Sequence, residues 1–153
     1  MDAKVVVDAS IWVSQFRPQD VNHNASRLWI EQYITVSGLM VAPVFLLIEV
    51  AAAISRRTGE HAMAKKAVED LNSTDSMQFA PMDSALVQAA IHIATNLQLR
   101  AGDAIYLALA HQLNIPLVSW DKEQLQKAST IITTYTPDAY VFPQSESEEP
   151  AEQ

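Results

Sequence analysis

Short hydrophobic runs alternate along the chain with longer segments in which apolar side chains recur every three or four residues. The short runs are typical of buried strands, and the longer segments are typical of amphipathic helices. The predicted strands are 4–7, 39–42, 77–80 and 117–119, followed by an edge strand at 139–142. The predicted helices are 11–16, 22–34, 44–58, 60–71, 84–97, 102–113 and 122–128.

This alternation predicts an α/β fold, a three-layer α/β/α domain with a mostly parallel sheet of four to five strands. Residues 1–142 are expected to form the domain. Residues 143–153 are expected to be a disordered acidic tail, because they are rich in Ser, Glu, Pro and Gln. In the helix at 22–34, the spacing places on the buried face Ala25, Leu28, Trp29 and Gln32.

Composition narrows the class of protein. Of the 153 residues, 49% are hydrophobic and 18% are charged, as expected for one globular domain. The absence of cysteine excludes disulfides, thiolate zinc sites and a cysteine nucleophile, and it fits a reducing compartment. The longest apolar stretch, 41–54, is interrupted by Pro43 and Glu49 and is too short to span a bilayer. We expect a cytoplasmic protein with no membrane partner and no signal peptide.

The net charge of −8 argues at first against a nucleic-acid partner, because phosphate binding draws on Lys and Arg. The last ten residues carry half of that charge, since they hold four Glu and no basic residue. Four further acids, described below, carry the other half. If they surround a metal ion, the rest of the domain has no net charge. The overall charge therefore does not decide whether the partner is a polyanion.

Four acidic residues lie in or directly beside strongly apolar runs. Asp8 follows a run of three valines, and Glu49 interrupts the apolar stretch described above. Asp103 opens the apolar segment 103–110, and Asp121 directly follows the strand predicted at 117–119 and Trp120. Carboxylates are rarely buried without a compensating partner, so four of them in such segments need an explanation.

Three of these acids have a simple structural explanation. Asp8, Asp103 and Asp121 each precede a predicted helix, where a carboxylate can cap the first N–H groups. Glu49 is different, because it lies inside a predicted helix with no Lys or Arg three or four residues away. It either faces solvent or has a metal ion or another segment as its partner, and the apolar character of the helix favours the second.

Four carboxylates without a nearby His or Cys form an all-oxygen ligand set, which suits Mg²⁺ or Mn²⁺ and not zinc. Such ions hold a phosphodiester, activate a water and stabilise the attacking and leaving oxygens. The pattern therefore indicates phosphodiester hydrolysis. Two alternatives stay open. A phosphotransferase or phosphatase would need an acid where Ser10 stands, and a catalytically silent binding module would keep the acids only as caps.

Four segments resemble the motifs of PIN-domain ribonucleases, most closely the VapC-type toxins of toxin–antitoxin pairs. The segments are Val7-Asp8-Ala9-Ser10, Ala42-Pro43 followed by Glu49-Val50-Ala51, 99–110 around Asp103, and Leu117-Val118-Ser119-Trp120-Asp121. Their order carries the resemblance, which extends from about Lys4 to Phe142.

The resemblance implies a metal-dependent endoribonuclease that acts as the toxin of such a pair. Asp8, Glu49, Asp103 and Asp121 would ligate one or two Mg²⁺ or Mn²⁺ ions, and RNA would be cut to 5′-phosphate and 3′-hydroxyl ends. Ser119 would orient a ligand or water and Ser10 would support the first acid, although capping explains both serines equally well. A homodimer and a VapB-like antitoxin covering the acidic site are also implied.

Other side chains are candidates for RNA contacts. Arg100 is preferred because it lies three residues before Asp103, whereas a solvated helix face is the simpler explanation for Arg56, Arg57, Lys65 and Lys66. The four histidines show no paired metal-ligand spacing and are expected at or near the surface. Trp12 and Trp29 are expected in the core or at a dimer contact, and Trp120, beside Asp121, leaves a base-stacking role open.

Overall fold

The computed structural model describes residues 3–143, so that most of the predicted acidic tail lies outside the described residues. Five strands form one sheet in the order β3-β2-β1-β4-β5, and every neighbouring pair is parallel. The strands are β1 (Lys4–Val7), β2 (Leu39–Pro43), β3 (Met77–Ala80), β4 (Leu117–Val118) and β5 (Thr134–Tyr135). The predicted α/β class is confirmed.

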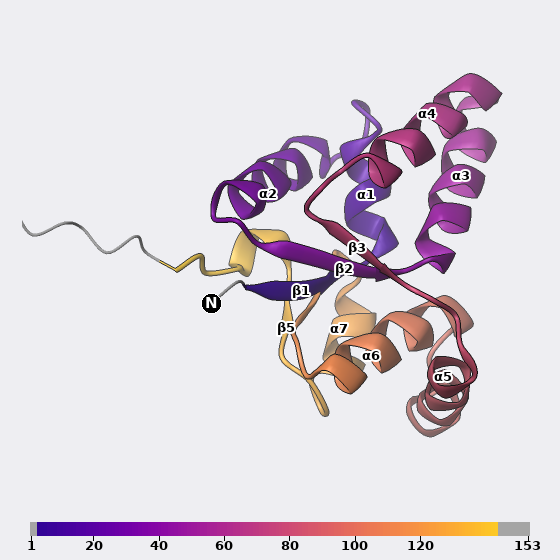
Figure 1. Ribbon diagram of the computed structural model, residues 1–153, viewed down its shortest axis with the longest axis vertical. Helices are drawn as coiled ribbons and strands as arrows, with labels where there is room; N and C mark the ends of the chain where they lie inside the picture. Colours follow the sequence, from indigo (N-terminus) through magenta and orange to yellow (C-terminus); the bar gives the residue numbers. More distant parts are fainter. Residues whose placement is uncertain (1–2, 144–153) are drawn as a thin grey trace, which may run out of the picture.

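Helices cover both faces of the sheet and complete three layers (Figure 1). One face carries α1 (Ala9–Gln15), α2 (His23–Thr35), α3 (Phe45–Thr58) and α4 (His61–Asn72). The other carries α5 (Ser84–Leu97), α6 (Ala101–Leu113) and α7 (Lys122–Ala128). The valines of β1 are fully buried, as expected for a central parallel strand covered on both faces. Among residues 3–143, no helix has the length and hydropathy needed to cross a bilayer.

The strand order places a topological switch between β1 and β4. The chain passes from β1 through β2 to β3 on one side, and it continues to β4 and β5 on the other. Loops that diverge at such a switch leave a crevice beyond the carboxyl ends of the two strands. The N–H of Asp8 donates to the carbonyl oxygen of Val118 at 3.0 Å, so the two strand ends leave the sheet side by side.

The predicted edge strand at 139–142 is wrong. The fifth strand is β5, which pairs with β4, and it is followed by a short 3-10 helix, η1 (Pro137–Ala139). Tyr140 and Phe142 pack against Trp29 and Tyr33 of α2, with ring centroids 5.7 to 6.5 Å apart. The aromatic composition that suggested a strand therefore serves packing onto a helix.

The predicted buried face of α2 is correct only at Trp29. Leu28 is 56% exposed, and Ala25 and Gln32 are exposed as well. The buried side chains of α2 are Ser26, Trp29, Ile30 and Tyr33. The helix is turned toward α1 and the C-terminal aromatic residues, so a polar side chain, Ser26, takes a buried position that simple hydrophobic spacing does not reveal.

Candidate active site

The four acids predicted from the sequence line one cavity of about 640 Å³. Asp8 directly follows β1, and Asp121 follows β4, which is the neighbour of β1 in the sheet. Glu49 reaches the cavity from α3, and Asp103 reaches it from the first turn of α6. The switch between β1 and β4 therefore brings together acids that are up to 113 positions apart in sequence.

Asp8 is held by hydroxyl and backbone donors. It is only 6% exposed, and its Oδ2 accepts from the N–H of Ser10 at 3.1 Å and from the hydroxyl of Ser119 at 3.0 Å. The first bond confirms that Asp8 caps α1. Ser119 also accepts from the N–H of Asp121 at 3.0 Å, so one buried hydroxyl ties the first acid to the backbone of the last.

Ser10 and Gln124 complete the surroundings of Ser119. The Ser10 hydroxyl lies 3.3 Å from that of Ser119 and accepts from the backbone N–H of Trp120 at 3.1 Å. The side-chain carbonyl oxygen of Gln124 lies 3.0 Å from the Ser119 hydroxyl. A hydroxyl has a single proton, and the carboxyl group of Asp8 and the amide oxygen of Gln124 both lie within hydrogen-bond distance of it. Both serines therefore organise the strand ends around Asp8.

Asp121 caps α7 as expected, whereas Asp103 does not cap α6. The Oδ1 of Asp121 accepts from the N–H of Gln124 at 3.1 Å. Helix α6 begins at Ala101 with Arg100 as its N-cap residue, which places Asp103 inside the first turn. Arg100 donates to Asp103 Oδ2 at 3.3 Å and to Asp121 Oδ2 at 2.9 Å. Arg100 thus lies beside the acids, as its position before Asp103 suggested, and its contact with RNA phosphate stays a prediction.

Glu49 has a hydrogen-bond partner that the sequence did not reveal. The hydroxyl of Tyr106, one turn after Asp103 on α6, donates to Glu49 Oε1 at 2.6 Å. Burial raises the pKa of Glu49 to about 7, the Tyr106 hydrogen bond opposes that rise, and Asp8 and Asp103 add to it. The only sequence signal for this contact is the presence of Tyr106 within an apolar helix, because the hydroxyl of a buried tyrosine needs a partner.

The acidic residues of the cavity carry more negative charge than the neighbouring cations balance. Burial and the neighbouring Asp8 raise the pKa of Asp103, against the lowering effect of Arg100. Among the described residues, no hydrogen bond reaches Oδ1 of Asp8, Oε2 of Glu49 or Oδ1 of Asp103. Three carboxylates that repel one another thus each keep an oxygen free, and this arrangement fits a hard divalent cation.

The acids do not yet form a coordination sphere. Within residues 3–143, no three acidic or histidine side chains converge in a metal-ligating arrangement. The carboxylates line the cavity wall, and the guanidinium of Arg100 bridges Asp103 and Asp121. The side chain of Arg100 is 80% exposed, so it is free to move aside for a cation. The donor set consists of carboxylate oxygens alone, and this chemistry fits Mg²⁺ or Mn²⁺.

Cations outside the acid cluster differ in their placement. Arg56 and Arg57 line the cavity and form no ion pair among the described residues. Lys65 lines a separate hollow between α3 and α4, and Lys66 pairs with Asp70 on its own helix at 3.1 Å. The two arginines are therefore the better placed of these cations for contact with a ligand of the cavity.

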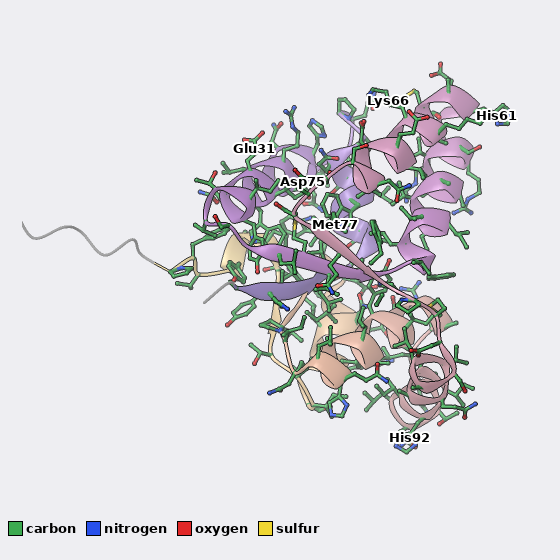
Figure 2. The ribbon with its side chains drawn as sticks, viewed as in Figure 1. Glu31, His61, Lys66, Asp75, Met77 and His92 are labelled. Atoms are coloured by element: carbon green, nitrogen blue, oxygen red, sulfur yellow. The ribbon has the colours of Figure 1, made fainter. Side chains whose placement is uncertain are left out.

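The four histidines are exposed or partly exposed, as expected. Figure 2 shows His61 and His92 at the outer surface, on α4 and α5, which cover opposite faces of the sheet. His111 is exposed near the end of α6, and the partly exposed His23 approaches the carbonyl oxygen of Ser14. Trp12 and Trp29 are buried in the core, as one of the two predictions for them had it.

Comparison with known families decides the classification. The profile of the PIN domain matches residues 5–129, which is most of the chain. This chain belongs to the PIN-domain family. PIN domains of the VapC type are nucleases, and the cavity described above lies within the matched residues. The comparison with curated protein sequences gives no match.

Solved structures show the same fold. VapC20 of Mycobacterium tuberculosis, a toxin that cleaves the sarcin-ricin loop, has a TM-score of 0.68 at 18% identity, covering 84% of this chain and 96% of that one. DNA-bound VapBC from Salmonella typhimurium has a TM-score of 0.68 at 12% identity, with 88% and 98% covered. A toxin–antitoxin complex from Klebsiella pneumoniae has a TM-score of 0.64 at 14% identity, with 87% and 97% covered. This PIN domain thus shares the fold of toxins found in toxin–antitoxin complexes.

Proposed function

We propose that this PIN domain is a metal-dependent endoribonuclease and the toxin of a toxin–antitoxin pair. The observation that carries the proposal is the convergence of Asp8, Glu49, Asp103 and Asp121 on one cavity at the switch of the sheet. The VapC-type fold supports the same chemistry, since VapC20 is a toxin that cleaves the sarcin-ricin loop.

In this proposal, Asp8, Glu49, Asp103 and Asp121 hold Mg²⁺ or Mn²⁺. When bound, such an ion holds the phosphodiester and lowers the pKa of a water that attacks phosphorus. Ser119 fixes the Asp8 carboxylate, and Ser10 fixes the strand end that carries Asp121. The bond between phosphorus and the 3′ oxygen breaks, which leaves 5′-phosphate and 3′-hydroxyl ends.

RNA needs positive charge near an acidic cavity, and arginines supply it. Arg56 and Arg57 line the cavity from the end of α3, without acidic partners among the described residues. Arg100 lies at the other side of the acids and pairs with two of them. With a cation held by the acids, the exposed guanidinium of Arg100 would be available to contact a phosphate group.

Cleavage by active-site variants tests the proposal. Asp8→Asn and Asp103→Asn should abolish Mg²⁺- or Mn²⁺-dependent cleavage of cellular RNA, and Asn at position 8 still caps α1. The matched control is Asp75→Asn, since Asp75 is exposed in the turn before β3, away from the cavity (Figure 2). Cleavage retained by both active-site variants would contradict the assignment.

A catalytically silent binding module is the second candidate, because the acids do not converge into a ligating arrangement. Thermal unfolding with increasing Mn²⁺ separates the two. The nuclease should gain about 2.7 kcal/mol of stability at a hundredfold excess over the dissociation constant, and Asp103→Asn should lose most of that gain. No metal-dependent shift at millimolar Mn²⁺ would favour the silent module.

The proposal includes two protein partners and a cytoplasmic location. A VapB-like antitoxin would cover the acidic cavity, in keeping with the toxin–antitoxin complexes among the structural neighbours. A homodimer would bury apolar side chains that α3 and α5 leave exposed, including Ile48 at 66% and Ile91 at 52%. Co-expression with the product of the adjacent gene should suppress cleavage, and Ile91→Lys should shift the purified toxin to a monomer in sedimentation velocity.

A further inference from the structure

Trp120 is an aromatic side chain with an unusual combination of anchoring and exposure. It lines the same cavity as the acids and is partly exposed, whereas Trp12 and Trp29 are 3% and 2% exposed. The aromatic pairs among residues 3–143 join α2, β5 and the C-terminal segment, and none of them includes Trp120. Its ring therefore has no aromatic partner within the described structure.

Buried serines anchor the indole of Trp120. The indole N–H donates to the hydroxyl of Ser26 at 2.8 Å, and that hydroxyl lies 2.6 Å from the hydroxyl of Ser14. Both serines are buried, at 0% and 2% exposed, and Ser14 donates onward to the carbonyl oxygen of Ile11 at 2.9 Å. At its other end, Trp120 is held through its backbone N–H by Ser10. The residue is fixed from α1, from α2 and from β4.

This anchoring decides what Trp120 presents to the cavity. An indole has one polar atom, its N–H, and here that atom is used inside the protein. The exposed part of the side chain is therefore aromatic carbon, beside an otherwise polar group of acids. Burying two serine hydroxyls costs free energy unless each hydroxyl stays paired. Their use to orient a single ring indicates that the orientation of Trp120 is important.

We infer that Trp120 forms a base-binding subsite, on which an unpaired base of single-stranded RNA stacks next to the phosphate being cut. The inference rests on the proposed function and names the part of the substrate that it positions. Aromatic platforms bind bases of single strands with little sequence preference, because every base has a π face. A base of a duplex is already stacked and paired, so this subsite selects single-stranded regions.

Tryptophan fluorescence tests the subsite without cleavage. A six-nucleotide single-stranded RNA, titrated into the full chain in EDTA, should quench the emission, and the same RNA in a duplex should not. Trp120→Phe should remove the quenching while it keeps most of the affinity, because phenylalanine also stacks. Trp12→Phe is the matched control, since that buried indole N–H has no partner among the described residues, and it should leave the quenching intact.

Kinetics test the positioning role. Trp120→Ala and Trp120→Leu should raise KM for single-stranded RNA roughly tenfold to a hundredfold with a smaller change in kcat, as expected for the loss of one base–aromatic stack. Ser26→Ala should raise KM by a smaller factor, because the ring stays but its orientation is released. Trp120→Leu keeps apolar bulk, so it preserves a readout if the alanine variant does not fold.

Two results would overturn the subsite: quenching that Trp120→Phe leaves unchanged, or an unaltered KM in Trp120→Leu. Absence of quenching in the unmodified protein would overturn it as well. Quenching at Trp120 in a protein that cleaves no RNA with any divalent metal would contradict the proposed nuclease and still support the base-binding subsite. The two proposals therefore fail in distinguishable ways.

Discussion

Tyr106 donates a 2.6 Å hydrogen bond to Oε1 of Glu49 and so joins helix α6 to helix α3 beside the acidic cavity. Tyr106 is completely buried, and burial is the main reason that the pKa of Glu49 is raised to about 7. Each side chain therefore supplies what the other lacks, a hydrogen-bond acceptor for the hydroxyl and a donor for the carboxylate. Glu49 therefore holds its proton to a higher pH than an ordinary glutamate does, which reflects its raised pKa.

The first prediction concerns stability against pH. Glu49 has an ordinary pKa of 4.5 and a folded pKa of about 7, so the folded state holds the extra proton between these values. The stability of the metal-free protein should therefore fall as pH rises through this window and level off above it. In Glu49→Gln, the free energy of unfolding should fall by about 1 to 2 kcal/mol less over this pH window, a figure that allows for the partial exposure of Glu49. Urea unfolding at pH 5 and 8 in EDTA measures it, and equal pH slopes in both proteins would refute it.

Tyr106→Phe should change the ionisation of Glu49. The hydroxyl stabilises the carboxylate form, so its removal should raise the pKa of Glu49 further above its ordinary value. A lost hydrogen bond of this kind also costs about 1 kcal/mol of folding stability. Carboxyl-carbon NMR titration of the metal-free protein measures the shift. Tyr135→Phe, on the edge strand β5, is the control and should leave the Glu49 titration unchanged.

Ser119→Ala should weaken both the fold and the site. The fully buried hydroxyl donates to Asp8 and accepts from the N–H of Asp121, so alanine leaves buried groups without partners. The expected loss is about 1 to 3 kcal/mol in unfolding free energy, with a reduced cleavage rate. The exposed Ser129→Ala, at the end of α7, is the matched control. If both variants unfold at the same urea concentration, the hydroxyl does not have the anchoring role assigned to it.

Arg100→Ala should show how the exposed guanidinium affects the pKa of Asp103 and whether it competes with a metal ion for the acids. Arg100 lowers the pKa of Asp103, so the pKa of that carboxyl should rise further when the charge is removed. At pH 8, Mn²⁺ should bind more tightly by calorimetry, because a competing cation has gone. Arg100→Lys keeps a positive charge and is the comparison. Unchanged Mn²⁺ affinity in Arg100→Ala would show that the guanidinium does not compete for the acids.

The sequence was sufficient to predict those site residues that come directly after a strand. Asp8 and Asp121 lie next to short apolar runs, and parallel sheets collect such residues at one edge. It was not sufficient where the rotation of a helix decides the contact. Neither the bond from Tyr106 to Glu49 nor the buried position of Ser26 follows from spacing alone, because both depend on how two helices face each other.

The wrong edge strand has a related cause. Residues 139–142 contain aromatic and β-branched side chains, which suit a strand and a helix-packing segment equally well. The deciding factor is tertiary, since Trp29 and Tyr33 offer these side chains a surface on α2. The same ambiguity does not affect 4–7, where three buried valines form a central strand that is covered on both faces.

The pairing of β1 with β4 also determines when the acidic cavity is completed during folding. Asp8 is synthesised early and Asp121 late, and they meet only after β4 has inserted beside β1. Contacts so distant in sequence form slowly, since the intervening chain must first be ordered. A growing or truncated chain that ends before β4 lacks both Ser119 and Asp121. Such a chain therefore cannot form the complete acidic cavity, which depends on a residue from each half of the sequence.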